Sequence, residues 1–204
     1  MQNTTDSFGG RLVVWNSIHD EIPGGAGLNV TRLDYIKHTA NVDKRWIQAG
    51  TPVYFDAATR IAEVCKSALV IDGGGATTPR VGKNHHFKVG DFVNDGTTSC
   101  LITAIDESAA AYDILTVHAA IIYAAATKFA EGAASGTTAV IKYTPNGVIK
   151  SPTWINDGNA DVPVVTIGEL READLTYPLT DAYKIALRGG ASQTTSSKSS
   201  ITVR

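Results

Sequence analysis

The sequence predicts a mainly β protein, built as a small antiparallel β-barrel or sandwich with one or two short helices, an extended N-terminal arm and a flexible C-terminal tail. Short runs of β-branched and aromatic residues separated by turn residues, clearest over 87–117, support this fold class. The composition agrees, because 19 glycines and a single methionine suit strands and tight turns better than long amphipathic helices. We expect an arm over 1–45, a β-rich core domain over 46–188 and a Ser/Thr-rich tail over 189–204.

The first 45 residues show little hydrophobic periodicity, which favours an extended segment. Arg11–Trp15 is a candidate for one short strand. The run Pro-Gly-Gly-Ala-Gly at 23–27 imposes an irregular backbone, since proline removes a donor and glycine tolerates positive φ. An arm cannot bury its own apolar side chains, so it has to lie on its own core or on a neighbouring subunit. The arm is therefore a first indication of assembly.

The core domain begins with a Gly-Thr-Pro turn at 50–52 that leads into a strand, where proline is tolerated at the first position. Residues 57–66 allow two interpretations, a helix or a β-turn followed by a strand over 61–65. Both stay open on the sequence alone. Six further runs are predicted to be strands, namely 69–71, 89–93, 101–105, 112–117, 140–143 and 162–167.

Strand 112–117 has two faces, because successive side chains of a strand point to opposite sides. One face holds Tyr112, Ile114 and Thr116, and the other holds Asp113, Leu115 and Val117. Turns are predicted at 94–96 and 145–147, where Asn-Asp-Gly and Pro-Asn-Gly are strong turn signals. Pro163 indicates that strand 162–167 lies at a sheet edge.

Two segments are predicted to be helical. Residues 118–134 are rich in alanine, the strongest helix former, and their apolar side chains recur at a helical spacing. A short helix over Thr180–Leu187 follows later, with Thr180 as its N-cap. The Gly/Ser/Thr-rich stretch 189–200 has the composition of a flexible linker, and residues 201–204 are expected to dock as a strand.

The charge and cysteine content exclude several classes of protein. A net charge of −2 gives no basic footprint for nucleic acid, and no apolar run reaches the length of a membrane span. The N-terminus lacks the basic and apolar regions of a secretory signal. Cys65 and Cys100 lie far apart and outside any metal-binding spacing, so we expect two buried free thiols in a protein made in a reducing compartment.

Several candidate ligand motifs fail on their spacing. Residues 75–83 lack the first glycine of a phosphate loop, and no Ser or Thr follows Lys83. Gly25-Ala26-Gly27 begins like a dinucleotide-binding fingerprint, but such a fingerprint must follow a strand, and none is predicted directly before it. Residues 157–161 begin like a calcium loop, but the required glycine and the twelfth-position glutamate are absent. His85 and His86 are adjacent, so in a strand they would face opposite sides. His19, His38 and His118 have no partner at a telling spacing.

Catalytic patterns are equally weak. No G-x-S-x-G elbow is present, and the carboxylate pairs Asp106/Glu107 and Glu169/Glu172 prove nothing without geometry. Trp15, Trp46 and Trp154 suit either a sugar-stacking platform or core and interface anchors, and we favour anchors. We therefore assign no catalytic, cofactor-binding or metal-binding residues, and we expect neither an enzyme nor a cofactor.

A family resemblance lies in five segments that together span residues 45–190. They are I-Q-A-G-T-P-V-Y-F-D (47–56), K-V-G-D-F-V-N-D-G (88–96), I-T-A-I-D with Y-D-I-L-T-V (102–117), V-P-V-V-T-I-G-E-L (162–170) and Y-P-L-T-D-A-Y-K-I-A-L-R-G (177–189). The chain resembles tailed-phage virion proteins, above all head fibre and capsid decoration proteins of phages and prophages of gut bacteria. The shared patterns belong to the β scaffold, and they name no catalytic residue.

The resemblance implies a small β-barrel protein attached to the outside of the phage head. Such proteins are commonly homotrimers whose N-terminal segment engages the shell. The implied partners are further copies of the chain, phage capsid proteins and host-surface glycans, with no nucleic acid and no membrane. The implied location is the virion, after synthesis in the bacterial cytoplasm. Decoration protein and fibre base both remain open.

Two other classes of function compete with this interpretation. One is a carbohydrate- or receptor-binding adhesive module, whose exposed tryptophan or tyrosine rings would stack on sugars. The other is a hydrolase whose site is assembled across subunits from Asp, Glu or His side chains, which a cleft with shifted pKa values would reveal.

Overall fold

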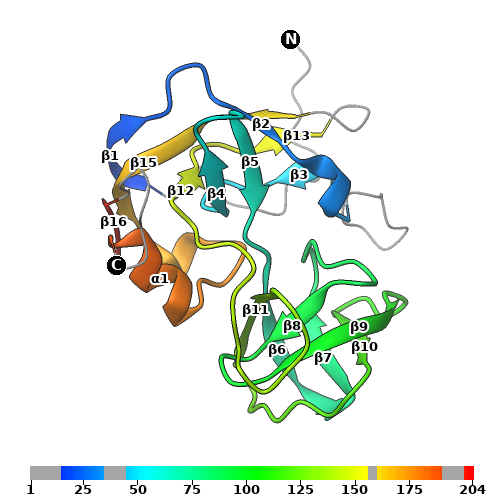
Figure 1. The fold of residues 1–204 in the computed structure, drawn as a ribbon. Helices are drawn as coiled ribbons and strands as arrows, with labels where there is room; N and C mark the ends of the chain where they lie inside the picture. The colour runs from blue at the N-terminus through cyan, green and yellow to red at the C-terminus, as the bar shows by residue number, and fades with distance from the viewer. Residues whose placement is uncertain (1–14, 35–44, 156–159, 190–199) are drawn as a thin grey trace.

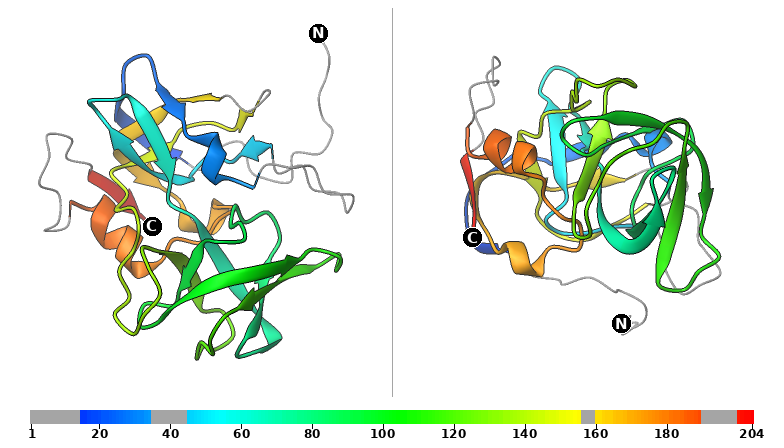
Figure 2. Two further views of the ribbon diagram at one scale, coloured as in Figure 1. Left: turned by 45° about the vertical axis from the view of Figure 1, so that its right-hand side comes forward. Right: turned by 90° about the horizontal axis from the view of Figure 1, so that it is seen from below.

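A computed structural model describes residues 15–34, 45–155, 160–189 and 200–204 of the chain (Figure 1). These residues form a mainly β structure with one short α-helix, as the sequence predicts. The strands belong to an eight-stranded curled sheet, a closed six-stranded barrel and a two-stranded ribbon. In Figure 1 and in the left view of Figure 2 the barrel lies below the body that contains the curled sheet.

The curled sheet draws its strands from both ends of the chain. They are β1 (Trp15–Glu21), β2 (Ala26–Leu28), β4 (Pro52–Asp56), β5 (Ile61–Val64), β12 (Gly147–Ile149), β14 (Asp161–Val162), β15 (Val164–Leu170) and β16 (Ser200–Val203). Their order is β1-β15-β12-β4-β5-β2-β14, with β16 parallel to β15. The helices η1 (Val30–Arg32), η2 (Glu172–Asp174) and α1 (Asp181–Leu187) and the ribbon of β3 (Trp46–Ile47) and β13 (Thr153–Trp154) accompany it.

The barrel is a single contiguous segment inserted between β5 and β12. Its strands are β6 (Ser67–Gly75), β7 (Thr78–Gly82), β8 (Phe92–Asn94), β9 (Ser99–Asp106), β10 (Tyr112–Val117) and β11 (Lys128–Gly132). They close in the order β10-β7-β6-β11-β8-β9, and every neighbouring pair is antiparallel. The chain therefore passes between the two bodies twice, at 64–67 and over 133–146.

Each body buries its own apolar side chains. The barrel encloses a core of Ala68, Val70, Val81, Phe87, Val93, Cys100, Ile102, Leu115, Val117, Ile121 and Phe129. The sheet body contains one cluster around Val53, Phe55 and Val164 and another around Val148, Leu170 and Tyr183. Closing a sheet into a barrel leaves no free strand edge, so the inserted segment can bury its core without help from the sheet body.

Several local predictions are confirmed. Of the two interpretations of residues 57–66, the turn followed by a strand is confirmed, because β5 pairs with β4 on one side and with β2 on the other. The alternation over 112–117 places Asp113, Leu115 and Val117 inside the barrel. Thr180 caps α1 by accepting from the Tyr183 N–H, and the C-terminal residues dock as β16.

The predicted helix over 118–134 is wrong. Residues 128–132 form β11, which pairs with β6 and β8, and Ala126 before it has a φ of 65°, which no helix accommodates. Ile121 is buried whereas its neighbour Ile122 is 90% exposed. Pairing with two barrel strands outweighs the helix propensity of alanine, which amounts to a few tenths of a kcal/mol per residue.

Other predicted elements also differ in the structure. No strand forms over 140–143, where an isolated bridge joins Ile141 to Gly132. The predicted turn at 145–147 is absent, since the Asn146 side chain bonds both backbone groups of Phe55 and Gly147 opens β12.

Strand boundaries move for similar reasons. Strand 89–93 is shifted to β8, which leaves Val89 60% exposed before it. Pro163 separates β14 from β15, and β15 has partners on both sides, so it is not an edge strand.

The described part of the predicted arm, 15–34, lies within the sheet body. β1 pairs with β15, β2 pairs with β5, and Leu28, Val30 and Leu33 are buried in the core. The strand predicted at Arg11–Trp15 overlaps β1 only at Trp15, and its other positions lie outside the described residues. Among the described residues, no helix is long and apolar enough to cross a membrane.

Candidate functional site

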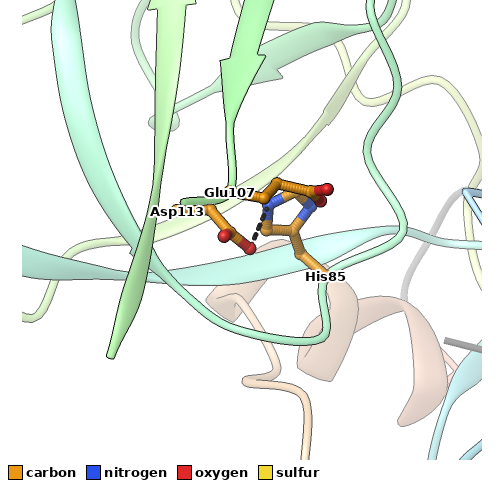
Figure 3. Close-up of side chains that lie close together, drawn as sticks. All are labelled: His85, Glu107 and Asp113. Carbon is orange, nitrogen blue, oxygen red and sulfur yellow. Dashed lines mark ion pairs between the residues drawn. The ribbon is translucent and has the colours of Figure 1, made fainter. Parts of the chain in front are cut away.

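A polar cluster at one end of the barrel is the main concentration of reactive side chains. Asp113 lies on β10, Glu107 directly follows β9, and His85 lies in the connection between β7 and β8. Figure 3 shows the three side chains converging, and their ligand atoms lie within 4.8 Å of one another. Barrel closure brings them together, because β10 pairs with both β7 and β9.

Lys83 is the fourth member of this cluster. Its Nζ donates to Asp113 Oδ1 at 2.5 Å and to the backbone carbonyl of Glu107 at 2.9 Å. The other carboxylate oxygen of Asp113 lies 3.3 Å from Nε2 of His85. Burial raises the pKa of Asp113, but hydrogen bonds from His85 and Lys83 outweigh burial and hold it below its ordinary value. Asp113 is therefore a carboxylate at neutral pH.

The tautomer of His85 follows from its second nitrogen. The backbone N–H of Phe87 donates to His85 Nδ1 at 3.2 Å, so Nδ1 is an acceptor and the proton of the neutral ring is assigned to Nε2. The N–H of Nε2 then faces the Asp113 carboxylate. Because Nδ1 already accepts from Phe87, a metal ion here would need the Nε2 lone pair and a carboxylate without a competing cation. The His85–Glu107–Asp113 set fits a metal ion poorly, because the Lys83 ammonium already lies on Asp113.

A second concentration of charge connects the two bodies. Arg32 donates to Glu63 of the sheet body at 2.7 Å and to both carboxylate oxygens of Glu131 of the barrel at 2.6 and 2.5 Å. Lys142 donates to Glu131 at 2.9 Å, and the Tyr143 ring lies 4.2 Å from the Arg32 guanidinium. Burial alone lowers the pKa of Arg32, yet its bonds to Glu131 and Glu63 prevail and raise it. Arg32 therefore joins sheet and barrel.

Lys66 extends this network at the first chain crossing. Its side chain is fully buried, and Nζ donates to Asp91 at 2.5 Å and to the backbone carbonyl of Arg32. Burial lowers the pKa of the Lys66 ammonium, although Glu131 and Asp91 favour its charge. The charges of Arg32, Lys66 and Lys142 match those of three carboxylates, so the network balances itself.

The two adjacent histidines serve different elements. His85 belongs to the barrel cluster, whereas His86 connects the bodies by bonding the Asp34 carbonyl and the Tyr177 hydroxyl, each at 3.0 Å. His118 accepts from the Leu101 N–H and contacts Ser135. His19 contacts Ser17 on β1, and His38 lies outside the described residues.

The structure brings two of the three tryptophans together. Trp46 and Trp154 oppose each other on the β3–β13 ribbon with ring centres 5.1 Å apart and an interplanar angle of 71°. The Arg45 guanidinium lies 4.2 Å from the centre of the Trp154 ring. Trp15 is elsewhere, with its Nε1 donating to the Lys150 carbonyl. A three-ring platform is therefore absent from the described residues.

The remaining candidate residues from the sequence do not come together in a common site among the described residues. Asp106 caps its own turn by accepting from Ser108, and Glu107 belongs to the barrel cluster. Glu169 pairs with Arg204, and Glu172 pairs with Lys128 and Lys184, so these two carboxylates hold different cations. Residues 157–159 of the calcium-like loop lie outside the described residues.

Both cysteines are free and buried, as predicted, and burial raises the pKa of each thiol.

A cleft of about 450 Å³ separates the barrel from the start of α1. The hairpin between β8 and β9, the turn before β11 and residues 180–182 line it. Its walls are mostly small, with Gly96, Ala126 and Ala182 among them, and a cleft of this volume accommodates a small molecule. Lys128 at its edge is already bound to Glu172 and the Leu179 carbonyl.

Sequence reasoning missed Lys83 and Asp113 as site residues. A signal for Asp113 was present, since the alternation of its strand places a charged residue on the same face as Leu115 and Val117. A charged residue on a buried face needs a partner. No sequence pattern identifies that partner as Lys83, because the contact depends on barrel closure. Comparison of the chain with known protein families, curated proteins and solved structures finds no significant match.

Proposed function

We propose that this chain is a structural protein of a tailed-phage virion, attached to the outside of the head as a head fibre or capsid decoration protein. It assembles as a homo-oligomer, with a trimer as the expected state, and its location is the virion after synthesis in the bacterial cytoplasm. The resemblance of five β-scaffold segments to such proteins supports this proposal. Two buried free thiols agree with synthesis in a reducing compartment.

The observation that best supports a scaffold role is the way the chain uses its buried charges. Arg32, Lys66 and Glu131 connect the sheet body to the barrel and bind one another or backbone carbonyls. Buried ion pairs of this kind fix the relative position of two bodies, which suits a structural component of a shell. The apolar side chains of Ile122, Ile185 and Val140 are 90, 62 and 56% exposed, and such surface is available for contact with other subunits.

The mass of the purified protein in solution tests the assembly. One chain weighs 21.5 kDa, and size-exclusion chromatography with light scattering should give three times this mass at micromolar concentration. Co-sedimentation with capsids that lack the protein should then saturate at a fixed ratio to the capsid subunit. A stable dimer, or a protein of any mass that does not sediment with those capsids, would contradict the proposal.

A second candidate function is a carbohydrate- or receptor-binding module, and the Trp46–Trp154 pair is the observation that favours it. Paired aromatic rings beside a guanidinium offer both a stacking surface and a donor for sugar hydroxyls. A glycan array tests it with the wild type and the Trp46→Ala variant. Binding that disappears in the variant supports this function, and an array without any signal removes it.

A further inference from the structure

Two lysine–aspartate pairs in or next to the barrel have close and largely buried contacts. Lys83 Nζ lies 2.5 Å from Asp113 Oδ1, and Lys66 Nζ lies 2.5 Å from Asp91 Oδ2. Both contacts join an amine to a carboxyl group across neighbouring parts of the barrel. An amine and a carboxyl group held in this way are the reactants of amide formation.

The Lys83–Asp113 pair adjoins the apolar core of the barrel on one side. The Asp113 side chain has no exposed surface, and that of Lys83 is 15% exposed. Val81 is paired with Asp113 across β7 and β10, Leu115 is its neighbour on the same strand face, and both are fully buried. Low polarity disfavours separated charges, so it reduces the free-energy difference between the ammonium–carboxylate pair and the neutral amine–acid pair.

The distance between the reacting atoms is short. Nζ lies 2.5 Å from Oδ1, and a carboxyl carbon lies about 1.2 Å from its oxygen, so Nζ is within about 3.7 Å of the Asp113 carboxyl carbon. Reacting atoms at about 3–3.5 Å are in a near-attack position. The Glu107 carbonyl accepts from the same Nζ and so helps to hold the amine over Asp113.

Only the Lys83–Asp113 pair has neighbours suited to moving protons. A carboxylate oxygen of Glu107 and Nε2 of His85 lie within 4.8 Å of the Asp113 carboxyl group. Beside the Lys66–Asp91 pair, the corresponding glutamate is Glu131, whose carboxylate oxygens are already bound by Arg32 and Lys142. The two pairs therefore share one contact distance but differ in their access to a general acid or base.

We propose that Lys83 and Asp113 condense to an intramolecular isopeptide bond that links the β7–β8 connection to β10. The Lys83 ammonium first passes one proton to the Asp113 carboxylate. The amine nitrogen then forms a bond to the carboxyl carbon, the bond from that carbon to its hydroxyl group breaks, and the nitrogen proton moves to the departing hydroxyl through Glu107. The products are one amide and one water, and nothing is oxidised or reduced.

The bond has a clear physical role and does not depend on the proposed function. Ion pairing favours the charged reactants, so the reaction is slow and occurs once per chain after folding. The amide then replaces a buried ion pair and closes a loop that contains β8 and β9, which limits the freedom of the unfolded chain. His85, whose Nε2 lies 3.3 Å from the Asp113 carboxylate, is a positioning residue for that group.

Intact-mass spectrometry of the full chain after incubation at 37 °C tests the proposal. The mass should fall by one water, about 18 Da, and trypsin should release residues 81–88, uncut at Lys83, joined to residues 89–128. Because this experiment uses the wild type, it does not depend on the folding of a variant. The proposal is overturned if the intact mass stays unchanged. It is also overturned if the chain loses one water but the loss maps to Asp95–Gly96 and no branched peptide is found.

Variants give a second, independent test. Lys83→Met and Asp113→Ala should abolish the branched peptide, and Lys66→Met is the matched control that should retain it. Glu107→Gln should slow its appearance at least tenfold while leaving the circular dichroism spectrum unchanged. In Asp113→Asn the leaving group becomes ammonia, so the mass should fall by about 17 Da in place of 18. A branched peptide that persists in Lys83→Met refutes the assignment.

Discussion

Replacing Arg32 by methionine should cost the protein about 3 kcal/mol of unfolding free energy. Arg32 donates to both oxygens of Glu131, whose side chain is only 1% exposed, and to Glu63, which is 15% exposed. Methionine keeps the volume of the side chain stem but removes the charge. A buried carboxylate would then remain with Lys142 as its only cation among the contacts described above.

The magnitude follows from the burial of the two partners. Breaking a buried ion pair by removing one member costs about 3–5 kcal/mol, because the other charge stays buried. The lower end applies here, since Lys142 still binds Glu131 at 2.9 Å and water reaches the Glu63 side of the network. Lys150→Met is the matched control. Its partner Glu21 is 47% exposed, and an exposed pair contributes between 0 and about 1 kcal/mol.

Urea unfolding at neutral pH, with linear extrapolation to zero denaturant, measures both losses. The double variant Arg32→Met/Glu131→Leu should be more stable than Arg32→Met by at least about 1 kcal/mol, because it removes the stranded charge. A loss of less than about 1 kcal/mol in Arg32→Met would contradict the assigned role of Arg32. Equal losses in Arg32→Met and in the Lys150→Met control would contradict it as well.

Three further predictions test other parts of the structure. Gly147→Ala should destabilise the protein by about 1–3 kcal/mol in thermal unfolding, because the added methyl group would lie 2.5 Å from a β15 side chain, and an unchanged Tm contradicts this packing. Thr180→Ala should cost about 1 kcal/mol through loss of the N-cap of α1, whereas Thr180→Ser should retain most of that stability. Burial raises the pKa of Glu172, but hydrogen bonds from Lys184 and Lys128 prevail and lower it. The contribution of the Glu172 ion pairs to stability is therefore complete above the unfolded pKa of Glu172 and is lost as pH falls through its folded pKa. Glu172→Gln should flatten the dependence of the urea midpoint on pH below about 4.5. Parallel profiles for the wild type and the variant would refute this.

Local patterns in the sequence were sufficient to predict the elements that depend on residues close to them along the chain. Strand 112–117 matches β10 at both ends, because its alternation of buried and exposed residues needs only one buried face. The N-cap at Thr180 follows from a hydroxyl three residues before a backbone N–H, which is also a local contact. The C-terminal strand was predicted over 201–204, although its partner β15 was not.

The sequence failed where distant pairing outweighs local preference. Residues 118–134 have helical propensity and helical spacing, yet their C-terminal part becomes β11 because β6 and β8 offer partners on both sides. Strand β6 continues through Asp72 to Gly75, where a strand end was expected, because β7 pairs along it. Residues 15–34 looked like an arm because their apolar positions are irregular, but strands from the rest of the chain cover them.

By itself the sequence determined the fold class, the turn-rich strands, the short capped helix and the burial of both thiols, since each follows from composition or from contacts within a few residues. That one contiguous segment closes into a barrel, and that Arg32 connects this barrel to the sheet body, became visible only in the folded structure. It alone placed Lys83 against Asp113. These contacts join residues 30 to 99 positions apart, and a periodic pattern records which face of a strand is buried but not which strand lies opposite.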